Sequence, residues 1–126
     1  MKQKRILLID DEDDLREVAQ VSLEIVAGWD VKTACCGSDG IIQAQKIQPD
    51  AILLDVMMPD MDGVTTFRHL QADPSTRKIP VIFLTAKVQS SDQRQFAELG
   101  VSGVISKPFD PISLATQVAA ALDWES

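Results

Sequence analysis

RILLIDDEDDL, residues 5–15, changes within a few positions from an apolar run to five consecutive acidic residues. The run Ile6–Ile9 has no alternation of apolar and polar residues, which is typical of a strand buried on both faces of a sheet. Residues 13–14 would stand in the first turn of a helix, where acids complement the helix dipole. Asp10 and Asp11 come too early for that role, so the stretch predicts a buried strand followed by two further carboxylates.

The rest of the chain repeats the pattern of a short apolar strand followed by a helix. The predicted strands cover residues 5–9, 30–34, 51–55, 81–85 and 103–106. The predicted helices cover residues 15–27, 38–47, 63–71, 90–99 and 111–122. Ser38 is the expected cap of the second helix, and Pro111 is expected to open the last one. Five strands that alternate with five helices predict an α/β domain, a doubly wound parallel sheet with helices on both faces.

Length and charge restrict the class of protein further. A chain of 126 residues fits one domain, and its net charge of −7 argues against DNA or RNA as a direct partner, because nucleic-acid surfaces need a basic stripe. No apolar stretch approaches the roughly 20 residues of a membrane span, and the apolar run near the start ends in acids, unlike a signal peptide. We therefore expect a cytoplasmic protein without membrane contact, in which Cys35 and Cys36 are reduced thiols.

Polar side chains stand at the carboxyl ends of the predicted strands. Asp10 and Asp11 follow the first strand, Asp55 ends the third, Thr85 ends the fourth and Lys107 follows the fifth. In open parallel sheets, ligands bind at this edge. Two carboxylates about 4 Å apart repel by about 4 kcal/mol at an effective dielectric constant of about 20, so the cluster must hold protons at a raised pKa or bind a cation. Oxygen ligands favour a hard ion, so we predict a Mg²⁺ site.

Asp55 is the carboxylate best placed for chemistry, because a buried strand holds its backbone rigidly. A carboxylate can attack a phosphoryl group and form an acyl phosphate. Phosphoryl transfer depends mainly on position and on neutralising the charge of the equatorial oxygens. Mg²⁺, the Lys107 ammonium and the Thr85 hydroxyl could each meet one of those oxygens. The residues therefore predict Asp55, Thr85 and Lys107 as the catalytic set.

Four motifs carry a resemblance to a known family: "LLIDDEDD" at residues 7–14, "AILLDVMMPDMDG" at 51–63, "VIFLTA" at 81–86 and "ISKPF" at 105–109. In their order and spacing they resemble a bacterial response-regulator receiver domain, and the likeness runs from Arg5 to about Leu122. The resemblance implies one flavodoxin-like receiver domain over residues 1–126, strand order 2-1-3-4-5, and no output domain.

The resemblance also implies how the metal and the phosphoryl group are held. Asp55 matches the phosphorylated aspartate, Asp11 a direct Mg²⁺ ligand, and Asp10 a ligand that acts through a bound water. The backbone carbonyl of Met57 matches the remaining protein ligand, so the implied metal set is Asp10, Asp11, Asp55 and Met57. We further expect the side chains of Met57 and Lys87 to shield the acyl phosphate from water.

The remaining motif positions concern the conformational change that phosphorylation would cause. Thr85 matches a hydroxyl that moves toward the phosphoryl group, and Lys107 matches the lysine that pairs with that group, in a cis Lys107–Pro108 peptide. Val104 departs from the family, which usually has an aromatic residue there, so a ring that swings with the hydroxyl is not expected. Gly63 fits a tight turn in which a Cβ would be costly.

The implied function is signalling rather than catalysis on other substrates. A sensor histidine kinase or a histidine phosphotransfer protein would donate a phosphoryl group to Asp55, and the chain would catalyse only its own phosphorylation and dephosphorylation. A downstream protein would then bind the face formed by residues 90–99, 103–106 and 111–122. The chain would be a stand-alone switch, a phosphorelay intermediate or a piece of a longer regulator.

Two other classes of function stay open. Hydrolases that form an aspartyl phosphate place a second acid two residues after the nucleophile, and this chain has Met57 there. The second class is a receiver-like interaction module that is never phosphorylated. The intact set of acidic, hydroxyl and lysine side chains argues against it, but Val104 keeps it open. Addition of a phosphoryl group separates these alternatives.

Overall fold

The computed structural model describes residues 3–86 and 89–124, and strands and helices alternate along the chain. The strands are β1 (Arg5–Ile9), β2 (Asp30–Ala34), β3 (Ala51–Asp55), β4 (Val81–Thr85) and β5 (Gly103–Ser106). The helices are α1 (Asp13–Ala27), α2 (Gly37–Ile47), α3 (Gly63–Ala72), α4 (Ser90–Leu99) and α5 (Leu114–Leu122). The strand pairs are parallel and the order is β2-β1-β3-β4-β5, which confirms the predicted fold class and strand order.

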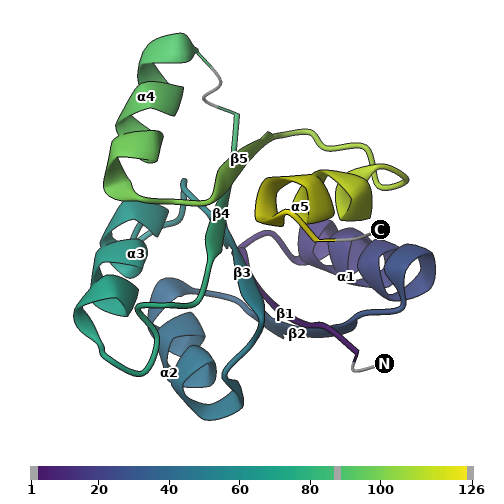
Figure 1. Ribbon diagram of the computed structural model, residues 1–126, viewed down its shortest axis with the longest axis horizontal. Helices are drawn as coiled ribbons and strands as arrows, with labels where there is room; N and C mark the ends of the chain where they lie inside the picture. Colours follow the sequence, from purple (N-terminus) through teal and green to yellow (C-terminus); the bar gives the residue numbers. More distant parts are fainter. Residues whose placement is uncertain (1–2, 87–88, 125–126) are drawn as a thin grey trace.

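Helices cover both faces of the sheet, with α1 and α5 on one side and α2, α3 and α4 on the other (Figure 1). Ile6 and Leu8 of β1 belong to the core beneath α1 and α5, whereas Leu7 and Ile9 belong to the core beneath the other three helices. Successive residues of the strand therefore face different helix layers. This arrangement explains why the central strands are apolar throughout and show no alternation.

The start of α2 differs from the prediction. The helix begins at Gly37 with Cys36 at the N-cap, and Ser38 is already inside the helix, so the predicted cap is wrong. A Cβ at Gly37 would collide with the Thr66 hydroxyl of α3. The N-cap thus lies two residues earlier than predicted, where a glycine lets the start of the helix approach α3 closely.

The start of α5 also differs. The helix begins at Leu114, and Pro111 lies in the turn before it. Asp110 organises that turn: its side chain accepts a hydrogen bond from the Ile112 N–H at 3.0 Å, and its carbonyl accepts one from the Ser113 N–H at 3.1 Å. These local bonds compete with the helix, so the helix starts three residues after the proline.

Other predicted features of the backbone are present. α1 and α4 end at Gly28 and Gly100, whose φ angles of 70° and 99° are left-handed, as expected for glycine caps. The Lys107–Pro108 peptide is cis, as the family resemblance implies. Within residues 3–86 and 89–124, every helix is too short or too polar to cross a lipid bilayer.

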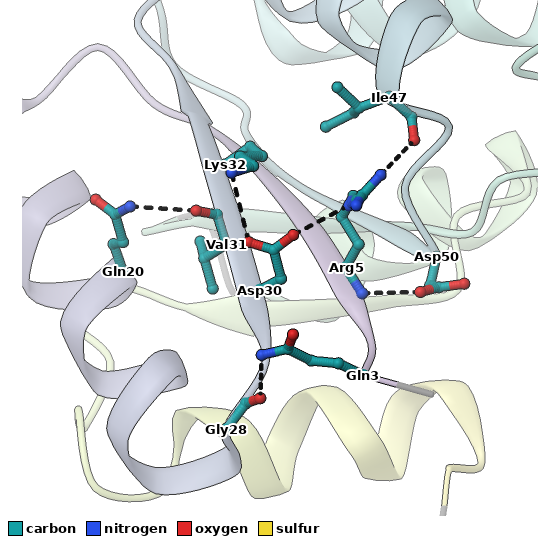
Figure 2. A network of polar contacts seen from close by, with 9 residues as sticks. All are labelled: Gln3, Arg5, Gln20, Gly28, Asp30, Val31, Lys32, Ile47 and Asp50. Atoms are coloured by element: carbon teal, nitrogen blue, oxygen red, sulfur yellow. Dashed lines mark hydrogen bonds and ion pairs between the residues drawn. The ribbon is translucent and has the colours of Figure 1, made fainter. Parts of the chain in front are cut away.

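A polar network fixes the amino edge of the sheet, opposite the predicted site (Figure 2). The Arg5 guanidinium donates to Asp30 Oδ2 of β2 at 3.1 Å and to the Ile47 carbonyl of α2 at 3.3 Å. The Arg5 backbone N–H donates to Asp50 Oδ2 at 2.8 Å, and Lys32 Nζ lies 3.5 Å from Asp30 Oδ1. Arg5 therefore ties β1 to β2 and to the turn between α2 and β3.

We expect Arg5→Met to lower the free energy of unfolding by about 1 kcal/mol, because two hydrogen bonds of a half-exposed side chain are lost while its apolar stem is kept. Lys32→Met removes only one long ion pair to the same carboxylate and should cost less than about 0.5 kcal/mol. Urea unfolding followed by circular dichroism measures both variants. Equal losses would contradict the central position of Arg5 in the network.

Candidate functional site

The predicted site residues lie at the carboxyl edge of the sheet, on strands that are neighbours in space. Asp10 directly follows β1, Asp55 and Thr85 are the last residues of β3 and β4, and Lys107 directly follows β5. Asp10, Asp55 and Thr85 are buried, with 0%, 1% and 0% of their surface exposed. Asp11 is partly exposed. The sheet topology thus brings these groups to one place, and their chemical roles stay predictions.

Lys107 is the cation at the centre of the cluster. Its Nζ lies 3.0 Å from Asp10 Oδ2, 3.1 Å from Asp55 Oδ1 and 3.4 Å from Glu12 Oε1. Only 12% of the Lys107 side chain is exposed, whereas the Glu12 side chain is 61% exposed and lies at the rim. Glu12 belongs to the acidic run at residues 10–14, but no role was predicted for it from the sequence. Its ion pair with Lys107 depends on how far the lysine side chain reaches from the end of β5.

Three carboxylates present buried oxygens to the same cluster. Among the described residues, Asp11 Oδ1 and Asp55 Oδ2 have no hydrogen-bond donor, and Asp10 Oδ2 is paired with the Lys107 ammonium. One ligand oxygen from each carboxylate can be chosen so that all three lie within 4.8 Å of one another. Buried charges without partners are costly. The donor set therefore fits Mg²⁺, which prefers a few carboxylate oxygens and keeps room for water or phosphate.

The electrostatics of the cluster set the protonation of its members. Burial raises the pKa of Asp55 from 3.8 to about 6, the charge of Asp10 adds to this rise, and Lys107 opposes it. For Lys107, burial alone would lower the pKa, but hydrogen bonds to Asp10 and Asp55 outweigh burial and the pKa is raised. The lysine therefore stays a cation, and Asp55 becomes a carboxylate anion above about pH 6.

The loop after β3 surrounds Asp55. The Met57 N–H donates to Asp55 Oδ1 at 3.2 Å, and the Met57 side chain is 60% exposed. A Cβ at Gly63 would lie 2.7 Å from Val56 Cα and would also collide with the Asp55 carbonyl, so this glycine is needed for close approach of α3 rather than for a special φ angle. Lys87, the second predicted shield, lies outside the described residues, and shielding stays a prediction.

The likeness to known proteins covers nearly the whole chain. A family model described as the response regulator receiver domain matches residues 6–119. The DNA-binding dual master transcriptional regulator RpaA of Synechocystis is 40% identical over 118 residues, which cover 94% of this chain and 48% of that protein. Response regulator PleD of Caulobacter vibrioides is 42% identical over 116 residues, which cover 90% of this chain and 25% of that protein. The chain thus spans half or less of the length of these two relatives.

Solved structures show the same fold. Chemotaxis protein CheY4 of Vibrio cholerae is 27% identical with a TM-score of 0.88, over 95% of this chain and 99% of that one. The N-terminal domain of a response regulator receiver protein from Methanoculleus marisnigri is 30% identical with a TM-score of 0.78, over 98% of this chain and all of that one, 100%. Because one relative named above is DNA-binding, the expected absence of a direct nucleic-acid partner stays a prediction drawn from charge alone.

Proposed function

The chain belongs to the receiver-domain family of two-component response regulators, and on that premise we propose that Asp55 accepts a phosphoryl group in a Mg²⁺-dependent reaction. The donor is a phosphohistidine on a sensor histidine kinase or a histidine phosphotransfer protein. The observation that supports this proposal is the cluster of buried carboxylate oxygens of Asp10, Asp11 and Asp55 beside the Lys107 ammonium. The chain catalyses only its own phosphorylation and dephosphorylation.

The chemistry follows from the positions of Asp55 and Lys107. A carboxylate oxygen of Asp55 forms a bond to phosphorus while the bond from phosphorus to the donor histidine nitrogen breaks, and that electron pair stays on the imidazole. Lys107 Nζ is already 3.1 Å from Asp55 Oδ1, where it can neutralise charge on the incoming phosphoryl oxygens. Asp10, Asp11 and Asp55, with the Met57 carbonyl, would hold Mg²⁺, which when bound neutralises charge on the same oxygens.

The signal leaves the site through α4 and its surroundings. Thr85 ends β4 just before the connection to α4, and a shift of its hydroxyl toward the phosphoryl group would move that connection. Among the described side chains of α4, Phe96 alone is buried, so few packed contacts resist a shift of the helix. We therefore assign the α4–β5–α5 face to a downstream protein. Val104 is packed against the core beneath α4, so the transition proceeds without a mobile ring at this position.

Acetyl phosphate, a small donor, tests the proposal without a partner protein. With Mg²⁺, the intact mass should rise by about 80 Da, the mass of one phosphoryl group, and Asp55→Asn should abolish the addition. No addition in wild type would favour the unphosphorylated interaction module. Rapid release of many equivalents of free phosphate would favour the hydrolase.

An exposed apolar face of α1 supports a protein as the natural donor. Val18, Val21 and Ile25 are 46%, 46% and 77% exposed, and Val18 lines a groove together with Glu12 and Phe109. Since Glu12 reaches Lys107, this groove borders the acidic cluster. An unpartnered apolar patch beside a reactive group is typical of a docking surface.

We expect Val18→Asp to slow phosphoryl transfer from a histidine kinase that phosphorylates the wild type by at least about tenfold, because a charge would be buried in the docked complex. Transfer from acetyl phosphate should not change. Ile42→Asp is the matched control, since Ile42 is 50% exposed on α2 at the other face of the sheet. Equal slowing by the two variants, or slowing of the acetyl phosphate reaction, would count against docking on α1.

A further inference from the structure

Glu12 has no part in the proposed phosphoryl transfer, although its side chain contacts the lysine of the acidic cluster. Its Oε1 accepts a hydrogen bond from Lys107 Nζ at 3.4 Å. The backbone of Glu12 is held on both sides. Its N–H donates to Asp10 Oδ1 at 2.9 Å, and its carbonyl accepts a hydrogen bond from the Arg16 N–H at 2.9 Å. A fixed backbone thus carries a carboxylate from the rim of the site to Lys107.

The Glu12 side chain is not used to begin helix α1. Glu12 is the N-cap of this helix, with extended φ and ψ angles of −86° and 111°, but its side chain makes no capping hydrogen bond. The residues that cap helices well are short, because their side-chain oxygen must reach an N–H of the first turn. The longer glutamate contacts Lys107 instead, so replacing it should alter the lysine contact more than the helix.

Lys107 cannot keep all of its carboxylate contacts once a phosphoryl group binds. Its Nζ lies 3.0 Å from Asp10 Oδ2 and 3.1 Å from Asp55 Oδ1, in addition to the contact with Glu12. An ammonium group has three N–H donors and here has three carboxylate neighbours. A phosphoryl oxygen on Asp55 can therefore accept a hydrogen bond from Lys107 only if one carboxylate gives up its contact.

The contact with Glu12 is the one that is easiest to break. The side chains of Asp10 and Asp55 are buried, so separating either of them from the ammonium would leave a buried charge without its partner. The Glu12 side chain is exposed, and water can replace the ammonium there. Its distance to Nζ is also the longest of the three, and exposed ion pairs are weak.

Given the phosphorylation of Asp55 proposed above, on which this role depends, we propose that Glu12 is a positioning residue that limits the rate of phosphoryl transfer through Lys107. In the unphosphorylated protein Glu12 holds one N–H of the ammonium, and it releases this N–H to a phosphoryl oxygen as the group arrives. An interaction that is present in the ground state and lost in the transition state slows the chemical step. Removal of the Glu12 contact therefore speeds the transfer.

Three variants separate the contact with Lys107 from the negative charge of Glu12. Glu12→Ala removes both, whereas Glu12→Asp keeps the charge on a side chain that is one methylene too short to reach Lys107. Asp14→Ala is the matched control, because Asp14 is an exposed acid that lines the same groove as Glu12. Among the described residues, the ion-pair partners of Lys107 are Asp10, Glu12 and Asp55, so Asp14→Ala changes the charge alone.

The rate of phosphoryl addition from acetyl phosphate, followed by intact mass at saturating Mg²⁺, measures the effect. At saturating acetyl phosphate we expect both Glu12 variants to react about threefold faster than the wild type, and Asp14→Ala to react at the wild-type rate. The concentration of acetyl phosphate that gives half the maximal rate should fall in Glu12→Ala and Asp14→Ala, because the donor is an anion, and should not change in Glu12→Asp.

The outcomes distinguish the role of Glu12 from the proposed function. A maximal rate in Glu12→Ala that does not exceed that of the wild type, or a wild-type rate in Glu12→Asp, would overturn the role of Glu12 and leave the phosphorylation of Asp55 standing. Equal acceleration by Asp14→Ala would assign the effect to charge and would also overturn it. No addition to the wild type would overturn both proposals. Circular dichroism controls for the folding of each variant.

Discussion

Asp55→Asn is expected to raise the free energy of unfolding by about 2 kcal/mol in metal-free buffer at about pH 8. The Asp55 side chain is buried and its pKa is raised from 3.8 to about 6, chiefly by burial and next by the charge of Asp10. At about 1.4 kcal/mol per pKa unit, this shift corresponds to an upper limit of about 3 kcal/mol. The amide that replaces the carboxylate needs a hydrogen-bond partner of its own, which reduces the gain.

The pH dependence of this gain has a definite sign. Because the pKa of Asp55 is higher in the folded state, the folded protein binds more protons than the unfolded chain between about pH 4 and about pH 6. Ionisation of Asp55 therefore destabilises the wild type as the pH rises through this range. The advantage of Asp55→Asn should be small at about pH 4 and complete above about pH 6.

Urea unfolding in the presence of a chelator measures the effect. Asp62 provides a control of opposite sign in the same loop, because its Oδ1 accepts a hydrogen bond from the Thr65 N–H at 2.8 Å and the resulting stabilisation lowers its pKa. Asp62→Ala should lose about 1 kcal/mol at neutral pH. A loss of stability in Asp55→Asn above pH 6, or a gain that does not vary with pH, would contradict this account. It would show that the folded state does not disfavour the charged form of Asp55.

Mg²⁺ is expected to stabilise the wild type strongly and to reverse this ranking. A ligand that binds only the folded state at about 100 times its dissociation constant adds about 2.7 kcal/mol. Asp10, Asp11 and Asp55 supply the oxygens, so Asp11→Asn should weaken the binding of Mg²⁺ by at least about tenfold. Asp55→Asn should gain little from the metal, so its advantage over the wild type in the free energy of unfolding should shrink and then reverse as Mg²⁺ is added.

Thermal unfolding across a Mg²⁺ titration measures these shifts. Asp14→Asn is the matched control, because Asp14 is an exposed acid in the first turn of α1 and is not part of the three-carboxylate cluster. It should keep the full response to Mg²⁺. A response that is the same in wild type and Asp11→Asn would place the bound metal elsewhere.

The strands β1, β3 and β4 could be predicted from the sequence most directly, because each is largely an apolar run between two helix layers. The starts of α2 and α5 could not, since one depends on the contact between Gly37 and Thr66 and the other on the hydrogen bonds of Asp110. The order of the strands was available only from the family resemblance, because apolar patterning does not say which strand lies beside which.

The candidate site, like the fold, could be predicted from the sequence only in part. Asp10 and Asp55 could be assigned to one edge because parallel strands carry their carboxyl ends in the same direction. The contact of Glu12 with Lys107 joins residues that are 95 positions apart, and no periodicity predicts it. A glycine at position 63 was expected because of a tight turn. The structure gives a different reason: the backbone of Asp55 and Val56 lies so close to Gly63 that a Cβ would collide with it.

The most direct measurement locates the phosphoryl group. After reaction with acetyl phosphate, borohydride reduces an aspartyl phosphate to homoserine, and peptide mass spectrometry identifies the residue that has changed. We expect homoserine at position 55 alone when Mg²⁺ is present, and none when the metal is chelated or when Asp11 is replaced by asparagine. Homoserine at Asp10 or Asp11, or equal conversion of Asp55 without Mg²⁺, would contradict a metal-assisted acceptor built from these strand ends.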